Sequence, residues 1–529
     1  MKLKVNQLKI GVVLSYLSII LGSIVSIVYT PMMLRLLGQS EYGLYTTVNS
    51  TISYLGLLNF GFGASYVRYY FKYKTKNDEE NIARLNGMYI SVFMVLTAIC
   101  LVAGSVLVMN TENIFGAKFT EGEIATAKVL MTILVVNMAL SFPNTVFNSY
   151  ITAKEQFLFQ RIMQMITSVF NPFLILPVLL IINRYNKTCA PGHFISGAIG
   201  LVAVSTAINI FVYVCNFIYC RRQKMRFIFK GFQKEVFKDV AIFSFYIFLN
   251  SVTDEINWMV DKFLLGIYHG TKITAIYGLA SQIVSYFRSF STAIYSVFIP
   301  RVNKIVQTSN DNAVLTDIFT RVGRVQFIVL SLISSGLVFF GKPFIYFWGG
   351  KDYGDSYLIM IVLVIPLMIP LVQNLGIEIQ KAKNMHKFRS VIYAIIAVGN
   401  LLLSIPLCKL YAGLGAAAGT AISLIIGNGI IMNIYYQKKV GLNIWHFWKN
   451  MIKFLPALVL PAVSGVLMNM FVDMYLRVGK IPVNLILCIA GYTVVFAISA
   501  WFLGFNSYEK ELFKKPFIKI TSKLMRKKV

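Results

Sequence analysis

Charged residues are scarce in this chain, and their scarcity limits what the chain can be. Of its 529 residues, 13% are charged and 57% are hydrophobic, and the mean hydropathy is +0.68. A soluble domain carries about 25% charged residues, because its surface must be solvated. The composition therefore excludes a soluble protein and predicts a chain that crosses a membrane many times.

Histidine and cysteine are also rare, and neither is spaced for metal binding. The four histidines fall in predicted loops far apart in the sequence, at His193, His269, His386 and His446. The six cysteines form no zinc motif and no paired framework, since only Cys189 lies clearly outside the apolar runs. We therefore expect neither a metal centre nor an organic cofactor.

Long polar loops are absent as well. The longest loops that we assign to the outer side of the membrane span only about fifteen residues. An enzyme that transfers or polymerises sugars needs acidic or histidine groups placed around its substrate. A membrane glycosyltransferase or polysaccharide polymerase is therefore the least favoured alternative, and we expect no enzymatic activity.

Long apolar runs are abundant instead. A helix needs about 20 apolar residues to cross the hydrocarbon core of a bilayer. Fourteen runs meet this length, near residues 10–34, 42–70, 86–109, 125–152, 162–182, 195–219, 240–265, 275–299, 325–347, 355–379, 390–411, 414–436, 451–471 and 482–504. The predicted fold class is an all-α polytopic membrane protein with about fourteen transmembrane helices.

Positive charge is unevenly distributed between the two sides of the membrane. The chain has 50 Lys and Arg against 21 Asp and Glu, a net charge of +29. With a cytoplasmic N-terminus, 36 of the 50 basic residues fall in or beside inner segments and 11 in or beside outer segments. Cytoplasmic loops carry an excess of Lys and Arg, so we expect both termini in the cytoplasm. Because these residues lie in short loops and not in a soluble domain, we expect no nucleic-acid partner.

An internal repeat divides the chain. The motif Leu36-Leu37-Gly38 recurs as Leu264-Leu265-Gly266, a step of 228 residues, and Arg161 recurs at the same step as Arg389. Each copy contains six apolar runs. An even number places both copies in the same orientation, related by a pseudo-two-fold axis along the membrane normal.

The repeat predicts five segments. They are an N-terminal six-helix lobe (1–219), a basic cytoplasmic linker (220–239), a second six-helix lobe (240–436), two additional transmembrane helices (437–504) and a basic amphipathic tail (505–529). Paired lobes of this kind enclose a central cavity and rock against each other. The linker and the tail are suited to the anionic lipids of the inner leaflet.

Ionisable residues on the seventh and eighth runs are the strongest functional signal. The seventh run carries four polar residues on one helical face, Asn250, Asp254, Asn257 and Asp261. The eighth carries a polar stripe with Arg288 near its middle. A charge that faces lipid at mid-membrane costs roughly 2.5–3.5 kcal/mol. The stripes therefore predict a hydrated cavity for a charged cargo or coupling ion, and the alternative is a buried Asp–Arg pair that only joins helices.

Polar residues on other runs allow two interpretations. Asn144 and Asn148 share a face of the fourth run, and Asn374 follows two prolines on the tenth. Prolines mark bending segments of transporters, whereas asparagines often only join neighbouring helices. Arginines near the inner ends of runs, such as Arg68 and Arg324, either snorkel to the interface or attract phosphate.

Short glycine- and tyrosine-containing motifs resemble those of a known family. The bacterial polysaccharide-repeat flippases, which handle O-antigen, capsule or teichoic-type repeat units, have an amino-terminal signature similar to Leu36-Leu37-Gly38, Tyr42-Gly43-Leu44-Tyr45, Leu58-Asn59-Phe60-Gly61-Phe62-Gly63-Ala64 and Arg68. Their superfamily also holds the multidrug and toxin extrusion (MATE) antiporters and the lipid II flippase. Fourteen spans resemble the polysaccharide and lipid II branches more than the twelve-span drug exporters.

The resemblance implies a function. Such relatives are taken to hold the diphosphate of a polyprenyl-linked oligosaccharide in a cationic cavity while the lipid tail stays in the bilayer. The resemblance therefore implies that this chain is a flippase of the bacterial plasma membrane. Its expected partners are membrane lipids, a polysaccharide polymerase and glycosyltransferases. A cation-coupled multidrug or metabolite antiporter and a lipid II flippase are the alternatives within the superfamily.

The candidate site residues fall into two groups. The predicted cargo-binding residues are Arg288, Arg68, Asn144, Asn148, Asn250, Asn257, Tyr295 and Asn374. The predicted ion-coupling residues are Asp254, Asp261 and Glu255. The acids depart from a purely cationic cavity and allow coupling to a proton or sodium gradient.

Overall fold

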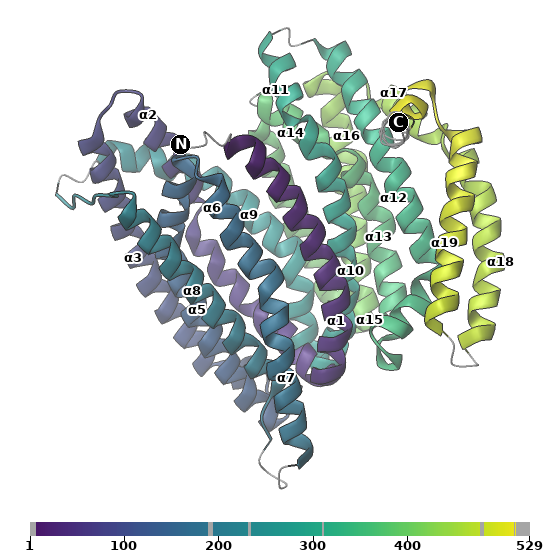
Figure 1. Ribbon diagram of the computed structural model, residues 1–529, viewed down its shortest axis with the longest axis horizontal. Coiled ribbons are helices and arrows are strands. Elements are labelled where there is room, and N and C mark those ends of the chain that lie inside the picture. The colour runs from purple at the N-terminus through teal and green to yellow at the C-terminus, as the bar shows by residue number, and fades with distance from the viewer. Residues whose placement is uncertain are drawn as a thin grey trace, which may run out of the picture. The chain divides into compact units, whose positions relative to one another are not determined.

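A computed structural model describes residues 7–188, 194–230, 234–308, 311–383, 385–476, 481–512 and 514. Every regular element in these ranges is a helix, and none of the ranges contains a strand (Figure 1). Joined across short breaks, the helices form fourteen long rods. Within the described ranges, nine of the helices are long and apolar enough to cross a bilayer. The predicted fold class of an all-α polytopic membrane protein is confirmed.

Contact density divides the chain into two compact units. The first consists of Met1–Leu279 and Ser390–Thr420, and the second of Ala280–Arg389 and Ala421–Val529. The helices α10 (Thr271–Tyr295) and α15 (His386–Leu424) each contribute to both units. The division into lobes, linker and tail stays a prediction.

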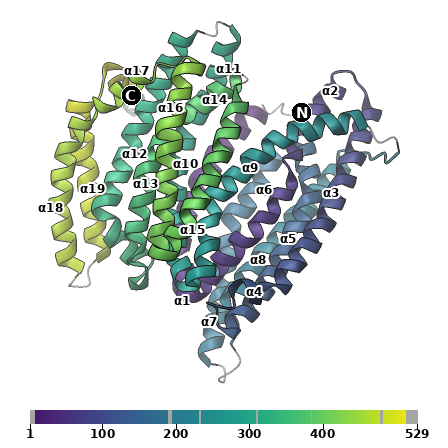
Figure 2. The ribbon, with the colours of Figure 1, turned by 180° about the vertical axis from the view of Figure 1, so that it is seen from behind.

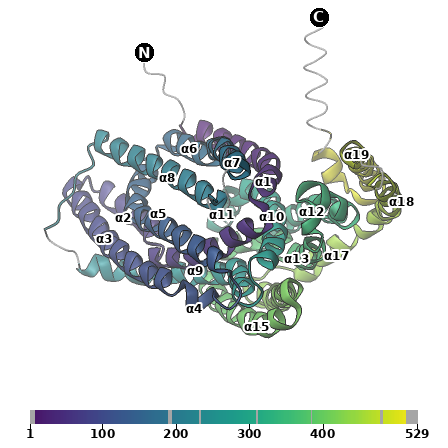
Figure 3. The same cartoon turned by 90° about the horizontal axis from the view of Figure 1, so that it is seen from below.

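The first unit is built on the N-terminal helices. They are α1 (Gln7–Ser53), η1 (Tyr54–Asn59), α2 (Phe62–Lys74), α3 (Glu79–Met109), α4 (Thr111–Phe115), α5 (Glu121–Ala153), α6 (Phe157–Met165), η2 (Ile166–Phe170), α7 (Asn171–Thr188), α8 (Gly197–Arg222) and α9 (Lys234–His269). Helix α5 packs against both α3 and α8, and α1 packs against α5, α6, α7 and α9 (Figure 3). The unit therefore combines the predicted first lobe with α9, the first helix of the predicted second lobe.

Two glycines of the repeated motif have different roles. Gly38 has a φ of 79° and breaks α1 into two rods. Gly266 lies inside α9, and the break that follows this helix occurs four residues later at Gly270, where φ is 80°. Gly266 instead packs against the side chain of Thr47. The repeat is therefore offset by one helical turn at this point.

The turns that follow the two breaks pack on each other. A Cβ atom on Gly43 would lie 1.8 Å from the carbonyl oxygen of Thr271, so only glycine allows this approach. Glu123 of α5 also stabilises the contact between the two turns. One of its carboxylate oxygens accepts hydrogen bonds from Ser40 Oγ (2.5 Å) and Thr271 Oγ1 (2.8 Å). Its other oxygen accepts from the backbone of Thr120 (2.9 Å) and completes a capping box.

The second unit is built around α12. Beyond α10, its elements are η3 (Ser296–Phe298), α11 (Ile299–Thr308), α12 (Asn312–Trp348), η4 (Lys351–Tyr353), α13 (Ser356–Val372), α14 (Asn374–Ala382), η5 (Ile425–Ile431), α16 (Met432–Tyr435), η6 (Tyr436–Val440), α17 (Ile444–Ile452), η7 (Leu455–Leu458), α18 (Val459–Leu476), α19 (Ile481–Ser499) and η8 (Ala500–Gly504). Helices α18 and α19 lie side by side and both pack against α12 (Figures 1 and 2). Phe340 and Tyr492 form part of that apolar contact.

A buried ion pair fixes the start of the C-terminal tail in this unit. Arg324 Nε and Nη2 donate to the two carboxylate oxygens of Glu509 at 2.5 and 3.0 Å, and the two side chains are 5% and 1% exposed. The guanidinium also donates to the carbonyls of Asn450 (2.5 Å) and Gly504 (2.8 Å). Arg324 therefore neither snorkels nor offers itself to phosphate, and that interpretation is wrong. The apolar positions predicted for the tail helix, Phe513, Phe517, Ile520 and Leu524, lie outside the described residues.

Candidate functional site

A buried polar cluster surrounds Asp261 in the first unit. Helix α9 supplies Asp261 and Asn257, one turn apart, while α10 supplies Tyr277 and α15 supplies Asn400 and Thr420. Asp261 is 2% exposed, and its Oδ2 atom accepts hydrogen bonds from the Tyr277 hydroxyl and from Thr420 Oγ1 (2.8 Å). The Asn400 Nδ2 atom lies 3.4 Å from both Thr420 Oγ1 and Asn257 Oδ1. Three helices of one unit are joined through this cluster.

A break in α15 makes the cluster possible. The backbone leaves the helical region at Tyr411 and Ala412, where Ala412 has a φ of 49°. The chain reverses there, so that Asn400 before the break and Thr420 after it come within hydrogen-bond distance. A straight helix would place these residues about 30 Å apart. The break therefore creates the site.

One oxygen of Asp261 is left without a hydrogen bond. Its Oδ1 atom is buried and has no partner among the described residues. Ser404 lies close enough to interact with the carboxylate, but its hydroxyl donates to Asn400 Oδ1 at 3.1 Å. Lys262, the next residue, acts on Asp261 through its electric field, and no ion pair to Asp261 occurs within the described ranges.

This arrangement suits a proton or a small monovalent cation. A buried carboxylate without a paired charge is costly, and either ligand would supply the missing positive charge. The neighbouring groups are hydroxyl and amide oxygens, which are ligands for hard cations. No group of three or more His, Cys, Asp or Glu side chains within the described ranges could hold a metal ion. The site therefore offers one carboxylate and neutral oxygens.

A second polar network lies in the other unit. Ser291 of α10 receives hydrogen bonds from Gln326 Nε2 (2.7 Å) on α12 and from Asn374 Nδ2 (3.0 Å) on α14. Its own hydroxyl donates to the carbonyl of Leu371 (2.9 Å) on α13. The network joins four helices, and it uses a backbone carbonyl next to Pro370, one of the two prolines inside α13.

Charged groups gather one turn further along α10. Tyr295 is half-buried, and the charges that act on its hydroxyl are those of Glu378, Arg389 and Arg288. Glu378 also pairs with Lys381 at 2.8 Å. Two of the three charges that act on Tyr295 are therefore positive.

The predicted ion-coupling residues have unequal surroundings. Asp261 is enclosed, Asp254 is exposed, and Glu255 is half-buried with a buried Oε1 atom that has no hydrogen-bond partner among the described residues. Asn257 takes part in the cluster described above. The side chain of Asn250 lies outside the described residues. The four-residue face of α9 is therefore buried toward Asp261 and open at Asp254.

Three predicted cargo-binding residues of the N-terminal helices lie elsewhere in the first unit. Asn144 accepts a hydrogen bond from Asn216 of α8 (2.9 Å), and Asn148 accepts one from Gln160 of α6 (3.0 Å). Both asparagines therefore join helices. Arg68 is exposed and lies at the middle of α2. That the predicted residues of the two units line one cavity stays a prediction.

Several members of these clusters were not predicted as site residues. They are Tyr277, Ser404 and Thr420 near Asp261, and Ser291, Gln326 and Arg389 in the second unit. Two signals were available in the sequence. Asn400 and Ser404 share a face of the eleventh apolar run, and Arg389 is the repeat partner of Arg161.

The fold is shared with membrane proteins of known structure. The lipid II flippase MurJ in an inward closed conformation matches with a TM-score of 0.68 and 17% identity, over 93% of this chain and 98% of that chain. An inward-facing multidrug resistance MATE family transporter of the MOP superfamily matches with a TM-score of 0.60 and 10% identity, over 79% and 94%. A MOP superfamily transporter from Pyrococcus furiosus, whose binding pocket is described as having reverse polarity, matches with a TM-score of 0.53 and 15% identity, over 82% and 95%. These likenesses define the class, a polytopic membrane protein with the MurJ and MATE fold.

The sequence itself identifies the family. A family model described as polysaccharide biosynthesis protein matches residues 8–306, more than half of the chain. The chain therefore belongs to the polysaccharide biosynthesis protein family, and the resemblance drawn from its short motifs is confirmed. No curated protein matches the sequence.

Proposed function

We propose that the protein is a flippase that moves polyprenyl-diphosphate-linked oligosaccharide repeat units from the cytoplasmic to the outer leaflet, for surface polysaccharide biosynthesis. The observation that carries this proposal is the family match over residues 8–306. The fold supports it, since a structure named as a lipid II flippase covers 93% of the chain. Movement between leaflets makes and breaks no covalent bond, so no enzymatic step is part of the proposal.

The basic group of the second unit is the proposed phosphate contact. A guanidinium can bind two phosphate oxygens at once. Arg288 faces the diphosphate in this scheme, and Arg389, which acts on the same tyrosine, is a further basic group of this unit. Arg68 is the second candidate. The sugar path is assigned to the predicted polar residues Asn144, Asn148, Asn250, Asn257, Tyr295 and Asn374.

The Asp261 cluster is the proposed site of the coupling ion. The Oδ1 atom of Asp261 has no hydrogen-bond partner among the described residues, and hydroxyl and amide groups surround the carboxylate. Both features support the binding of a proton or a sodium ion. Because three helices meet at the cluster, an ion bound there stabilises one arrangement of these helices over another, which is what coupling requires. Asp254 and Glu255 are the secondary candidates.

The proposed location is the bacterial plasma membrane, with both termini in the cytoplasm. The excess of basic residues on the inner side supports this orientation. A polysaccharide polymerase and glycosyltransferases are the proposed partners, since they use and supply a lipid-linked oligosaccharide.

Replacement of Arg288 tests the proposal. The variant Arg288→Ala, expressed in a deletion strain, is expected to abolish surface polysaccharide at a normal protein level, and to stop movement of a fluorescent polyprenyl-diphosphate oligosaccharide in vesicles. Arg321→Ala is the matched control, because Arg321 is exposed and its contacts are a surface ion pair with Asp317 and the ring of Tyr508. Full surface polysaccharide in the Arg288→Ala strain would contradict the assignment.

A cation-coupled exporter of drugs or metabolites is the second candidate. The specific observation in its favour is a buried carboxylate that has no ion-pair partner within the described ranges, because such a site suits a cationic cargo as well as a coupling ion. Drug sensitivity separates the two functions. A deletion strain that keeps its surface polysaccharide and becomes sensitive to cationic drugs would favour the exporter.

A further inference from the structure

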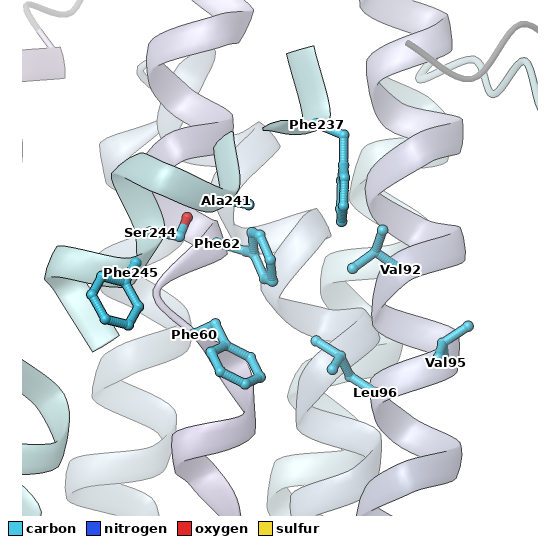
Figure 4. A pocket seen from close by; sticks show the side chains of 9 residues that line it. All are labelled: Phe60, Phe62, Val92, Val95, Leu96, Phe237, Ala241, Ser244 and Phe245. Atoms are coloured by element: carbon cyan, nitrogen blue, oxygen red, sulfur yellow. The ribbon is translucent and has the colours of Figure 1, made fainter. Parts of the chain in front are cut away.

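An apolar cavity lies where α9 meets η1, α2 and α3 in the first unit. Its volume is about 440 Å³, within the range of ligand pockets. Nine residues line it, as Figure 4 shows: Phe60, Phe62, Val92, Val95, Leu96, Phe237, Ala241, Ser244 and Phe245. We call this space the α9 cavity.

The lining offers no free polar group. Ser244 is the one residue of the lining with a polar side chain, and its hydroxyl donates to Ser65 Oγ at 3.2 Å. Ser65 in turn lies 2.9 Å from the Tyr89 hydroxyl, so the hydrogen bonds are used up between α9, α2 and α3. Phenylalanines of α9 and of the turn that leads into α2, together with aliphatic residues of α3 and α9, provide the rest of the surface. A ligand of this cavity must therefore be apolar.

The cavity has a closed floor and an open rim. Leu96 and Phe62 are 8% exposed and Ser244 is 1% exposed, whereas Val95 and Phe245 at the rim are 60% and 54% exposed. At bilayer depth, an open apolar rim faces hydrocarbon and not water. A chain from the surrounding lipid can enter from that side.

A basic strap fixes positive charge at the inner end of the cavity. We define the strap as residues 224–230, which contain Lys224, Arg226 and Lys230 and no acidic residue. Its backbone is held on α3, because Asn86 Nδ2 donates to the Arg226 carbonyl (2.8 Å) and the Ile228 amide donates to the Ala83 carbonyl (3.0 Å). All three basic side chains remain exposed.

The strap and the cavity are close along α3. Asn86 precedes Val92 by six residues, which is about 9 Å of helix. The cavity also begins near the inner end of α9, since Phe237 is the fourth residue of that helix. Asp239 at this mouth interacts with the Tyr69 hydroxyl, and it is a single acidic residue against the three basic residues of the strap.

We propose that the α9 cavity holds the isoprenoid chain of a polyprenyl diphosphate, with the diphosphate beside the basic strap. The inference rests on the proposed function for the identity of the lipid. Four phenylalanines line the cavity, and the methyl branches of an isoprenoid chain pack against aromatic faces. The negative diphosphate complements the positive charge of the strap, whereas the headgroup of a neutral phospholipid does not.

A second apolar hollow provides a matched control. It is larger, about 670 Å³, and lies on the first unit between η2, α7 and α8, where Ala207 and Phe211 are among its lining residues. Phe211 is 55% exposed, close to the 54% of Phe245. Ordinary membrane lipid is expected there.

Photocrosslinking tests the proposal directly. The full-length protein carries p-benzoylphenylalanine in place of Phe245 or, separately, Phe211. Each variant is placed in vesicles of phosphatidylethanolamine and phosphatidylglycerol with added polyprenyl diphosphate. The adducts are identified from their masses by mass spectrometry. We expect polyprenyl diphosphate adducts at position 245 and phospholipid adducts at position 211. Phospholipid adducts in equal measure at both positions would overturn the proposal.

Filling the cavity is the second arm of the test. Ala241→Trp should lower the polyprenyl adduct at position 245 and slow lipid movement by roughly fivefold, because excluded isoprene units lose apolar contact. Ala207→Trp should change neither quantity. Val92→Phe serves if Ala241→Trp does not fold, as judged by its melting temperature. An unchanged adduct in a folded filling variant would refute the site.

The failures of the two proposals are distinguishable. If the unmodified protein moves lipid-linked oligosaccharide but position 245 captures only phospholipid, the cavity assignment fails and the proposed function stands. If position 245 captures polyprenyl diphosphate but no oligosaccharide carrier moves, the proposed function fails and the site stands.

Discussion

Two buried carboxylates in this protein have opposite surroundings. Glu509, in the second unit, has both oxygens occupied by Arg324, and one of them also accepts from the backbone of Asn506 (2.9 Å). Asp261, in the first unit, has two hydroxyl donors on one oxygen and none on the other. Both side chains are almost fully enclosed.

The difference separates a carboxylate whose charge is compensated from one that keeps unused acceptor capacity. Glu509 is fully compensated, so a ligand would gain nothing there. Asp261 keeps unused acceptor capacity in a place where an uncompensated charge is expensive. An incomplete set of partners at a buried acid is therefore a better indicator of ion binding than burial itself. The predictions below test this difference between the two acids, and the strongest expected effect comes first.

The largest effect is expected at the paired acid. Arg324→Leu leaves Glu509 buried without its cation and removes donors from two carbonyls, so the protein should lose about 3–5 kcal/mol of stability. The melting temperature of the purified protein measures this loss. The double variant Arg324→Leu with Glu509→Leu should recover much of it, because no charge is left buried alone. A double variant that is less stable than the single one would contradict the account.

A large functional effect with little effect on stability is expected at the unpaired acid. Asp261→Asn keeps the shape of the side chain but removes its charge, so affinity for the coupling ion should fall roughly 10- to 100-fold, the range for a lost charged interaction. Transport driven by imposed proton and sodium gradients in vesicles measures the change. A melting temperature near that of the parent protein is the control. Gradient-driven transport at the original rate would exclude Asp261 as the coupling site.

A smaller effect is expected at the hydroxyl that orients this acid. Tyr277→Phe removes one donor to Asp261 Oδ2 but leaves Thr420 in place. The loss of one hydrogen bond of about 0.5–1.5 kcal/mol should weaken ion affinity by roughly 2- to 10-fold. The ion concentration that gives half-maximal transport measures the shift. Tyr286→Phe is a comparison on the same helix, and an equal shift in both variants would indicate an unspecific effect.

The smallest effect is expected at an exposed pair. Lys74 and Glu79 meet at 2.7 Å with side chains 47% and 71% exposed, and their pair should contribute less than about 1 kcal/mol. The hydrogen bond to Glu79 raises the pKa of Lys74. The contribution is therefore present at neutral pH, and it is lost when pH rises through the raised pKa of Lys74. Glu79→Gln should leave the melting temperature at pH 7 unchanged, and a clear drop that persists in high salt would contradict this.

The membrane fold could be predicted from the sequence because its signal is local. A transmembrane helix is recognised by about 20 consecutive apolar residues. The fourteen predicted runs correspond to the fourteen helical rods of the described residues. The short glycine motifs were also sufficient to place the chain in its family. Neither inference needs residues that are far apart in the chain.

The site was harder to predict because its contacts are distant in sequence. Asp261 was singled out by its charge in an apolar run, but Thr420 lies 159 residues away and reaches it only through the break at Ala412. Arg324 was misread for the same reason, since Glu509 is 185 residues away. An ionisable residue in a span can be seen in the sequence, whereas its partner cannot.

The contact at Gly43 leaves no room for a side chain between two turns. The two backbones are in contact there with no side chain between them. A single added methyl group would clash with the facing backbone, and it has no other rotamer that would avoid the clash. Any relative with another residue at this position must keep the turns apart. Alanine at position 43 would therefore force the two turns apart by the addition of a single carbon atom.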